Sequence, residues 1–353
     1  MKKVFFIIFC IFSPVLLNAQ IDTIRTEKLG VKGKIQNIKE FTFKAIDKMG
    51  NIVKGDMCED VFAIDNEYRK SNHSYSFDRS GNQIQETEFW SPTSIKSTQI
   101  YTYLNGRIVE SNVKTIFSDQ TISVKWIFKY NINKLLSSSS RYRNGILLDK
   151  YVYEYDDRGN IVSEKQIDSE GNICNSISSI FKYSGDKLIY SKQDDSEHGI
   201  DVKEYEYDSK GQIFIKKVNY DNNFIRTIKY SYNDSGLTSA VYETDENGKF
   251  IVQTLYNYDS LNNVISENQT FFDNQKSSKE YSFEGNIKTE IYNTIEGKLE
   301  KRIYKNENII KFEKDGCEYD YKYSFDNQGN WVKIIEFKNT IPTLIRERII
   351  LYY

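Results

Sequence analysis

The sequence predicts an all-β fold, a long antiparallel meander of about 20 strands built from hairpin repeats of about 25 residues, with the sheet coiled or rolled. Three observations predict it. Tyrosine and phenylalanine recur at alternate positions, as on one face of a strand. Turn residues of the form Asp-x-x-Gly-Asn follow many of these aromatic pairs directly. The two features return together at a nearly constant spacing, which indicates that one structural unit is repeated.

The clearest unit runs from Tyr151 to Ile161 and reads Tyr-Val-Tyr-Glu-Tyr-Asp-Asp-Arg-Gly-Asn-Ile. Its tyrosines stand two residues apart, so they share one face of a strand. Asp156 can accept hydrogen bonds from backbone amides ahead of it, and Gly159 takes the positive φ that closes a turn. A helix would scatter these tyrosines around its surface. The unit therefore predicts a strand, a tight turn and the start of a second strand.

Copies of this unit recur along the chain. They comprise Tyr75, Phe77, Asp78, Gly81 and Asn82; Tyr205, Tyr207, Asp208 and Gly211; Tyr230, Tyr232, Asn233 and Gly236; Tyr256, Tyr258, Asp259 and Asn262; and Tyr323, Phe325, Asp326, Gly329 and Asn330. Including shorter turns, the residue after each aromatic pair falls at 78, 104, 131, 156, 184, 208, 233, 259 and 284. A second turn signal, such as Asp168 to Gly171, divides most units into two strands. Because twist makes sheets beyond ~10 strands curl, split or close, we expect a coiled or rolled sheet with its aromatic face inward.

The chain divides into three predicted parts. Residues 1–19 have Lys2 and Lys3, an apolar run and Ala19 before the expected cleavage point, which is typical of a signal peptide. The apolar run is shorter than the ~20 residues of a membrane-spanning helix, so we expect export and no transmembrane anchor. Residues 20–63 fit the period less well and are predicted to be an N-terminal cap or degenerate repeat. Residues 64–353 are the hairpin array.

Composition argues against several kinds of partner. Removing Lys2 and Lys3 changes the formal net charge from -2 to -4, and the two signs are mixed along the chain, so no nucleic-acid partner is expected. Cys58, Cys174 and Cys317 are odd in number and widely spaced, which argues against a disulfide framework. The sequence has no CxxC motif and no calcium-loop or phosphate-loop pattern, so neither a metal site nor a cofactor is expected.

No residue set reaches the standard of a catalytic site, so we expect a protein that is not an enzyme. Asp156 and Asp157 occupy a repeated turn, and Asp194 and Asp195 lie in a polar stretch that is predicted to be a loop. The histidines, His73 and His198, are both expected on the surface. A hydrolase site in the roll of the sheet stays open as a third hypothesis.

The aromatic stripes have two interpretations. Tyrosines that recur in every unit at the same place are typical of a packed core, whereas exposed aromatic rings bind sugar rings by stacking. A specific site is therefore expected where the repeat is broken. The candidate ligand-binding residues at such places are Trp90 and Trp126.

The Tyr-x-Tyr-Asp-x-x-Gly-Asn units resemble the YD repeats of the RHS family, found in bacterial polymorphic toxins and toxin-complex shells. The resemblance implies a long β-sheet that spirals into a hollow shell. Gly33-Lys34-Ile35 near the start and Leu351-Tyr352-Tyr353 at the end also look like small exported YD-repeat proteins of Bacteroidetes. The chain ends in what we expect to be its own last strand, so a toxin cargo domain is not expected.

These observations favour a non-enzymatic secreted or cell-envelope protein that provides an extended surface for binding another protein. The alternative is a carbohydrate-binding module that uses exposed aromatic residues. The expected partner is an envelope or extracellular protein, or a glycan, and the expected location is the periplasm, the outer surface or the medium.

Overall fold

The computed structural model describes residues 31–58, 72–117, 120–221 and 224–353. The predicted signal peptide, residues 1–19, lies outside them. The described residues form one antiparallel sheet of 25 strands. The strands are β1 (Ile35–Lys48), β2 (Asn51–Met57), β3 (His73–Phe77), β4 (Gln83–Ser91), β5 (Ser94–Leu104), β6 (Arg107–Phe117), β7 (Gln120–Tyr130), β8 (Leu136–Arg143), β9 (Ile146–Tyr155), β10 (Ile161–Asp168), β11 (Ile173–Ser184), β12 (Lys187–Asp195), β13 (Gly199–Tyr207), β14 (Ile213–Tyr220), β15 (Phe224–Tyr232), β16 (Thr238–Asp245), β17 (Phe250–Tyr258), β18 (Val264–Phe271), β19 (Lys276–Glu284), β20 (Ile287–Asn293), β21 (Leu299–Lys305), β22 (Asn308–Lys314), β23 (Cys317–Phe325), β24 (Trp331–Lys338) and β25 (Ile341–Tyr352).

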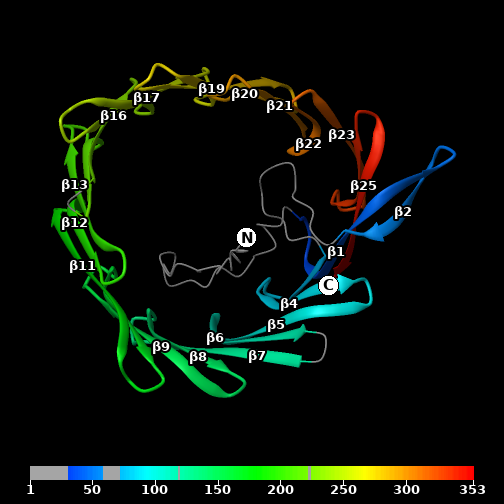
Figure 1. Cartoon of the computed structure of the whole chain (residues 1–353), viewed down its shortest axis with the longest axis horizontal. Coiled ribbons are helices and arrows are strands. Elements are labelled where there is room, and N and C mark those ends of the chain that lie inside the picture. The colour runs from blue at the N-terminus through cyan, green and yellow to red at the C-terminus, as the bar shows by residue number, and fades with distance from the viewer. Residues whose placement is uncertain (1–30, 59–71, 118–119, 222–223) are drawn as a thin grey trace, which may run out of the picture.

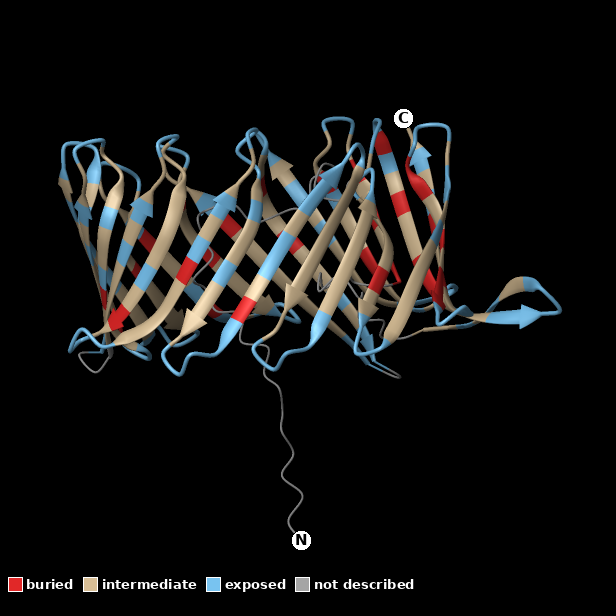
Figure 2. Cartoon of the chain, turned by 90° about the horizontal axis from the view of Figure 1, so that it is seen from above, coloured by how far each residue is buried: buried red, intermediate tan, exposed pale blue. Residues whose placement is uncertain are grey.

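The sheet closes on itself through β1. One edge of β1 pairs with β25, from Ile35 opposite Tyr352 to Lys44 opposite Leu344. The other edge pairs first with β3 and then with β2. The hairpin of β1 and β2 extends away from the ring (Figures 1 and 2). The closed barrel therefore has 24 strands, β1 and β3 to β25.

The all-β prediction is confirmed, but the prediction of an open, coiled or rolled meander of about 20 strands is wrong, because the sheet is a closed barrel of 24 strands. Closure joins residues 308 positions apart, such as Glu40 and Arg348, and no local sequence pattern reports such a pairing. β1 comes from the region predicted to be a cap or degenerate repeat. By pairing with both β3 and β25, it satisfies backbone groups that two open sheet edges would leave without partners.

The Asp-x-x-Gly-x turns are stabilised by the aspartate. In most of them, Oδ1 accepts hydrogen bonds from the backbone N–H groups two and four residues ahead, as at Asp156 with Arg158 (3.0 Å) and Asn160 (2.8 Å). The same pair of bonds occurs at Asp78, Asp168, Asp208, Asp245, Asp259 and Asp326. The amide of Asn172 and then the backbone N–H groups lower the pKa of Asp168. Asp168 and Asp245 are the last residues of β10 and β16, whereas Asp156 follows β9, so turns of this kind occur at both rims of the barrel.

The last tyrosine of each unit ties neighbouring strands together. In several units its hydroxyl donates to the backbone carbonyl of the first or second residue of the preceding strand, as from Tyr155 to Leu136 at 2.7 Å. Equivalent bonds of 2.6 to 2.8 Å are made by Tyr207, Tyr232 and Tyr258. A phenylalanine at this position would leave that carbonyl without this donor, so the bond explains why tyrosine recurs here.

A β-bulge follows most of these turns. Tyr155 lies opposite Ile161, but Glu154 lies opposite Ser163, so Val162 is an extra residue. The same shift puts Ile189, Phe214 and Ile265 outside the pairing in later units. A bulge bends the strand and increases its twist, and its repetition favours the curvature that closes the barrel.

Candidate functional site

The two faces of the sheet differ in burial. In β9, Asp149 and Tyr153 are buried and Tyr151 and Tyr155 are half-buried, whereas the residues between them are mostly exposed. Side chains on the concave face of a closed sheet converge and cover one another, while those on the convex face diverge. The face with the tyrosines is therefore the inner wall, and the expectation that the aromatic face points inward holds for these strands. Figure 2 shows the buried residues as separate bands along the strands.

The inner wall has an aromatic zone beside the Tyr-Asp turns. Its best-packed part is a cluster of Ile108, Phe128, Leu136 and Tyr153, against which Trp126 packs. The Trp126 ring lies 6.2 Å from that of Phe128 and 6.1 Å from that of Tyr151, centre to centre. The packing of these side chains is similar to that of a domain core, but they form a single layer on the inner wall.

Further from these turns the inner wall is polar and charged. Most of the charges form pairs between neighbouring strands or along one strand. Examples are Lys203 with Asp201 (2.7 Å), Arg226 with Glu243 (3.1 Å), Lys288 with Glu290 (2.6 Å) and Lys314 with Glu300 (2.5 Å). All of these residues except the exposed Lys314 are half-buried, so they face water or a polar ligand rather than an apolar core.

A second polar cluster lies where the barrel closes. Arg348 of β25 donates from Nε and Nη2 to Glu40 Oε2 of β1, at 3.2 and 2.9 Å. Its guanidinium carbon is 3.6 Å from the centre of the Trp331 ring. His73 lies next to Glu86, with Nε2 3.4 Å from Oε1, and is 3% exposed. The prediction that His73 is a surface residue is therefore wrong, because β1 lies beside its strand and places Glu40 directly opposite it.

The outer face carries charges at mid-strand. Along β23 the residues that alternate with the inward tyrosines are Glu318, Asp320, Lys322 and Ser324, and none of them is apolar. Other strands carry exposed apolar side chains on the same face, such as Ile100, Ile180 and Leu255, so the outer face is mixed in character. The described residues contain no helix that is long and apolar enough to cross a membrane.

The structure separates the two predicted ligand-binding residues. Trp126 lies on β7 in the inner aromatic zone, with the guanidinium carbon of Arg141 5.5 Å from its ring centre. Trp90 lies near the end of β4, is 45% exposed and has Lys96 Nζ 4.7 Å from its ring centre. β5 and β6 lie between their strands, so the two tryptophans do not form one site.

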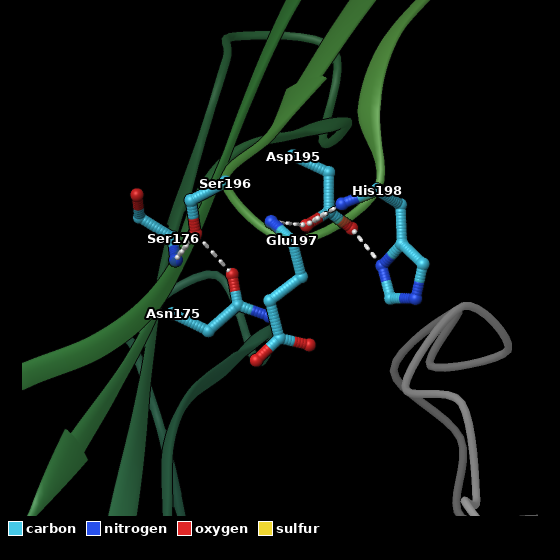
Figure 3. Close-up of polar contacts among 6 residues, drawn as sticks. All are labelled: Asn175, Ser176, Asp195, Ser196, Glu197 and His198. Carbon is cyan, nitrogen blue, oxygen red and sulfur yellow. Dashed lines mark hydrogen bonds and ion pairs between the residues drawn. The ribbon is translucent and has the colours of Figure 1, made fainter.

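The polar stretch around Asp195 forms the end of β12 and a turn at the rim (Figure 3). Asp195 Oδ1 accepts hydrogen bonds from the N–H groups of Glu197 (2.9 Å) and His198 (3.3 Å), and Oδ2 lies 3.2 Å from His198 Nδ1. The His198 side chain is 74% exposed, as predicted. Asp194 and Asp195 are neighbours in a strand, so they point to opposite faces and cannot act as an acid pair.

Sequence reasoning missed several buried charged residues of the inner wall, among them Glu164 and Arg348. Glu164 lies opposite Tyr153, and burial followed by the charge of Asp195 raises its pKa to about 7. No local pattern marks it, because its inward direction depends on the β-bulge at Val162, which arises from pairing with β9. Within the residues that the structure describes, no group of three or more His, Cys, Asp or Glu side chains is arranged to hold a metal ion.

No family model matches this chain, and no curated protein sequence matches it either. Among solved structures, it is similar to a chain of the Photorhabdus luminescens Tc holotoxin pore, with 14% identity and a TM-score of 0.37 over 79% of this chain and 16% of that one. A porin-like protein from Bacteroides uniformis is 11% identical, with a TM-score of 0.26 over 69% of this chain and 95% of that one. The TcdB2-TccC3 structure is 11% identical, with a TM-score of 0.24 over 86% and 19%.

This chain thus spans less than a fifth of each of the two toxin chains. They belong to the toxin complexes whose shells the YD units resemble, but similarity at this level shows no family. Membership of the YD-repeat proteins and a Bacteroidetes origin therefore stay predictions.

Proposed function

We propose that the protein is a non-enzymatic, exported binding protein that holds another polypeptide against the inner wall of its barrel. The observation that carries this proposal is the chemistry of that wall, which is polar, charged and half-buried in strand after strand. Paired charges such as Arg226 with Glu243 offer donors and acceptors to a peptide backbone, and the aromatic zone offers apolar contacts.

The size of the barrel supports the same use. With strands ~4.8 Å apart, 24 strands have a circumference of at least ~115 Å and a backbone diameter of at least ~37 Å. Barrels of about 16–18 strands already enclose a water-filled channel. A ring of this width has room for a polypeptide segment.

Site-specific photo-cross-linking tests this proposal. A photoreactive phenylalanine analogue replaces either Ile228, on the inner face of β15, or Lys229, its neighbour on the outer face. Each full-length variant is illuminated with a cysteine-alkylated, permanently unfolded polypeptide and, separately, with envelope extract. The proposal expects cross-linked product from position 228 and little from position 229. Products at 229 alone, or at neither position with either sample, would refute it.

Glycan binding is the second candidate, and the exposure of Trp90 is the observation that favours it. One face of this ring lies near Lys96, and the residue is open enough for a sugar to stack on it. Trp126 is a poorer platform because aromatic rings and Arg141 surround it. Binding on a glycan array that is lost in Trp90→Ala and kept in Trp126→Ala would support this function, and no binding by the parent protein would exclude it.

A further inference from the structure

Two acids, Glu164 and Asp195, belong to one row of paired residues that crosses the inner wall from β9 to β12. Glu164 of β10 lies directly opposite Tyr153 of β9 and, on its other side, opposite Ile177 of β11. Ile177 in turn lies opposite Asp195 of β12. Residues opposite one another in an antiparallel sheet point to the same face, so Tyr153, Glu164 and Asp195 all project inward.

Glu164 differs from the other buried acids among the described residues. Asp149 pairs with Arg141, Asp195 is held by its own turn, and Glu336 accepts a hydrogen bond from the Thr343 hydroxyl at 2.7 Å. Glu164 is 8% exposed, and no described residue donates a hydrogen bond to it or forms an ion pair with it. A buried carboxylate without a counter-charge is costly, and a cation supplied by a ligand removes that cost.

The Tyr153 hydroxyl is a second buried group in this row without a full set of partners. The residue is 4% exposed, and its hydroxyl makes no hydrogen bond of ordinary geometry with any residue that the structure describes. Burial is the main cause that raises the pKa of Tyr153, the charge of Glu164 raises it further, and the nearby Ser139 lowers it. A polar group buried in the same row as Glu164 is therefore available to a ligand.

In the neighbouring strands β8 and β9, a similar buried carboxylate already has a cation beside it. Arg141 of β8 forms an ion pair with Asp149 of β9, and its guanidinium lies over the Trp126 ring. A carboxylate, an aromatic ring and a cation are thus combined within the wall itself. Glu164 and Tyr153 provide the carboxylate and the ring one strand further on, without the cation.

We propose that Glu164, with Tyr153 beside it and Asp195 two strands away, binds a cationic side chain, the ammonium of a lysine or the guanidinium of an arginine, from the polypeptide held in the barrel. This inference rests on the proposed function and names the chemistry of its ligand. A hard metal ion fits less well, because Ca²⁺ takes about 6–8 oxygen ligands and this row supplies two carboxylates among aromatic rings. An organic cation gains from both the carboxylate and the ring face.

Isothermal titration calorimetry with a tetra-lysine peptide tests the inference on the full chain. Since burial raises the pKa of Glu164 to about 7, about a tenth of it is ionised at pH 6 and about nine-tenths at pH 8. The peptide stays cationic at both values, so it is expected to bind about tenfold more tightly at pH 8. Near pH 7 its binding is expected to release about half a proton, measured in two buffers of different ionisation enthalpy.

Four controls make the result specific. Glu164→Gln is expected to lose both the affinity at pH 8 and the pH dependence, and Asp195→Asn is expected to weaken binding. Glu267→Gln removes an inner-wall acid that already has Lys279 3.8 Å away, and it is expected to bind as the parent does. His198→Gln, next to Asp195, is expected to keep the pH dependence. A tetra-lysine peptide acetylated on every side chain is expected not to bind.

Binding that is unchanged in Glu164→Gln, or equal for the acetylated peptide, overturns the inference, as does a parent protein that binds no tetra-lysine. Circular dichroism and thermal unfolding of Glu164→Gln and Asp195→Asn exclude loss of fold as the cause of lost binding. The photo-cross-linking at positions 228 and 229 does not involve Glu164. A polypeptide that cross-links inside the barrel while tetra-lysine binding ignores Glu164 therefore refutes the cation site and leaves the proposed function intact.

Discussion

Replacing Arg348 by methionine is expected to weaken the closure of the barrel. Arg348 is 5% exposed, and it joins β25 to β1 through its two hydrogen bonds to Glu40. Methionine keeps much of the apolar stem and its packing against Trp331. The change therefore removes the charge and the donors, while it removes little volume.

The size of the loss in stability depends on the Glu40 carboxylate, which is left without its ion-pair partner. The Glu40 side chain is only 13% exposed, so the variant has a mostly buried carboxylate that has lost its arginine. Breaking a buried ion pair on one side costs about 3–5 kcal/mol, and the cation over the ring adds up to about 2 kcal/mol that overlaps with it. We expect Arg348→Met and Glu40→Gln each to lower the free energy of unfolding by about 3–5 kcal/mol. The double variant buries no unpaired charge, so it is expected to lose about 2–3 kcal/mol less than the sum of the two.

Urea unfolding followed by far-ultraviolet circular dichroism and tryptophan fluorescence measures these changes. The matched control is Lys217→Met with Glu206→Gln, a pair 3.4 Å apart on the barrel in which both side chains are 48% exposed. An exposed pair contributes about 0–1 kcal/mol, so the control variants are expected to unfold near the parent midpoint. The reasoning fails if Arg348→Met costs no more than the control, or if the losses of the two single variants simply add in the double variant.

Three further outcomes are expected. Tyr155→Phe removes the hydrogen bond to the Leu136 carbonyl and is expected to cost about 1 kcal/mol in urea unfolding; no measurable loss would count against the tyrosine bonds as stabilising contacts. The raised pKa of Glu164, about 7 against an ordinary 4.5, means that its contribution to stability is complete below pH 4.5 and is lost as pH rises through 7, by up to about 3 kcal/mol. Glu164→Gln is expected to abolish that part of the pH dependence, and an unchanged profile would contradict the assignment. Ile345→Ala, at a residue with 0% exposure, is expected to cost about 2–5 kcal/mol, against less than about 1 kcal/mol for Ile349→Ala, which is 58% exposed; equal losses would be inconsistent with the packing described.

The local structure followed directly from sequence. The turn at Asp156 is specified by Asp, Gly and Asn at fixed offsets, and the side chains that close it lie within four residues of one another. Tyrosine spacing gave the strand and the shared face of Tyr151, Tyr153 and Tyr155, because a strand alternates its side chains whatever its neighbours are.

The inner-wall position of Glu164 was out of reach for a physical reason. Simple alternation from Ile161 puts Ser163 and Lys165 on the inner face and Glu164 on the outer face. The bulge at Val162 reverses that assignment, and a bulge depends on pairing with β9 rather than on a local motif. The surface prediction for His73 was wrong for a similar reason, because its burial depends on β1, which pairs with β3 but is distant from it in the sequence.

Closure through β1 also has a consequence for how the chain folds. The hairpins from β3 to β25 pair with their sequence neighbours, so they can form early and in any order. Only β1 must be shared between a strand near the start and the last strand, and loop-closure entropy makes that step late and slow. Until it occurs, a chain has two complementary edges, and the β1 of one copy matches the β25 edge of the next. The same strand pairing that closes one chain into a ring would then link incomplete chains head to tail, so we expect domain-swapped filaments as the misfolded product.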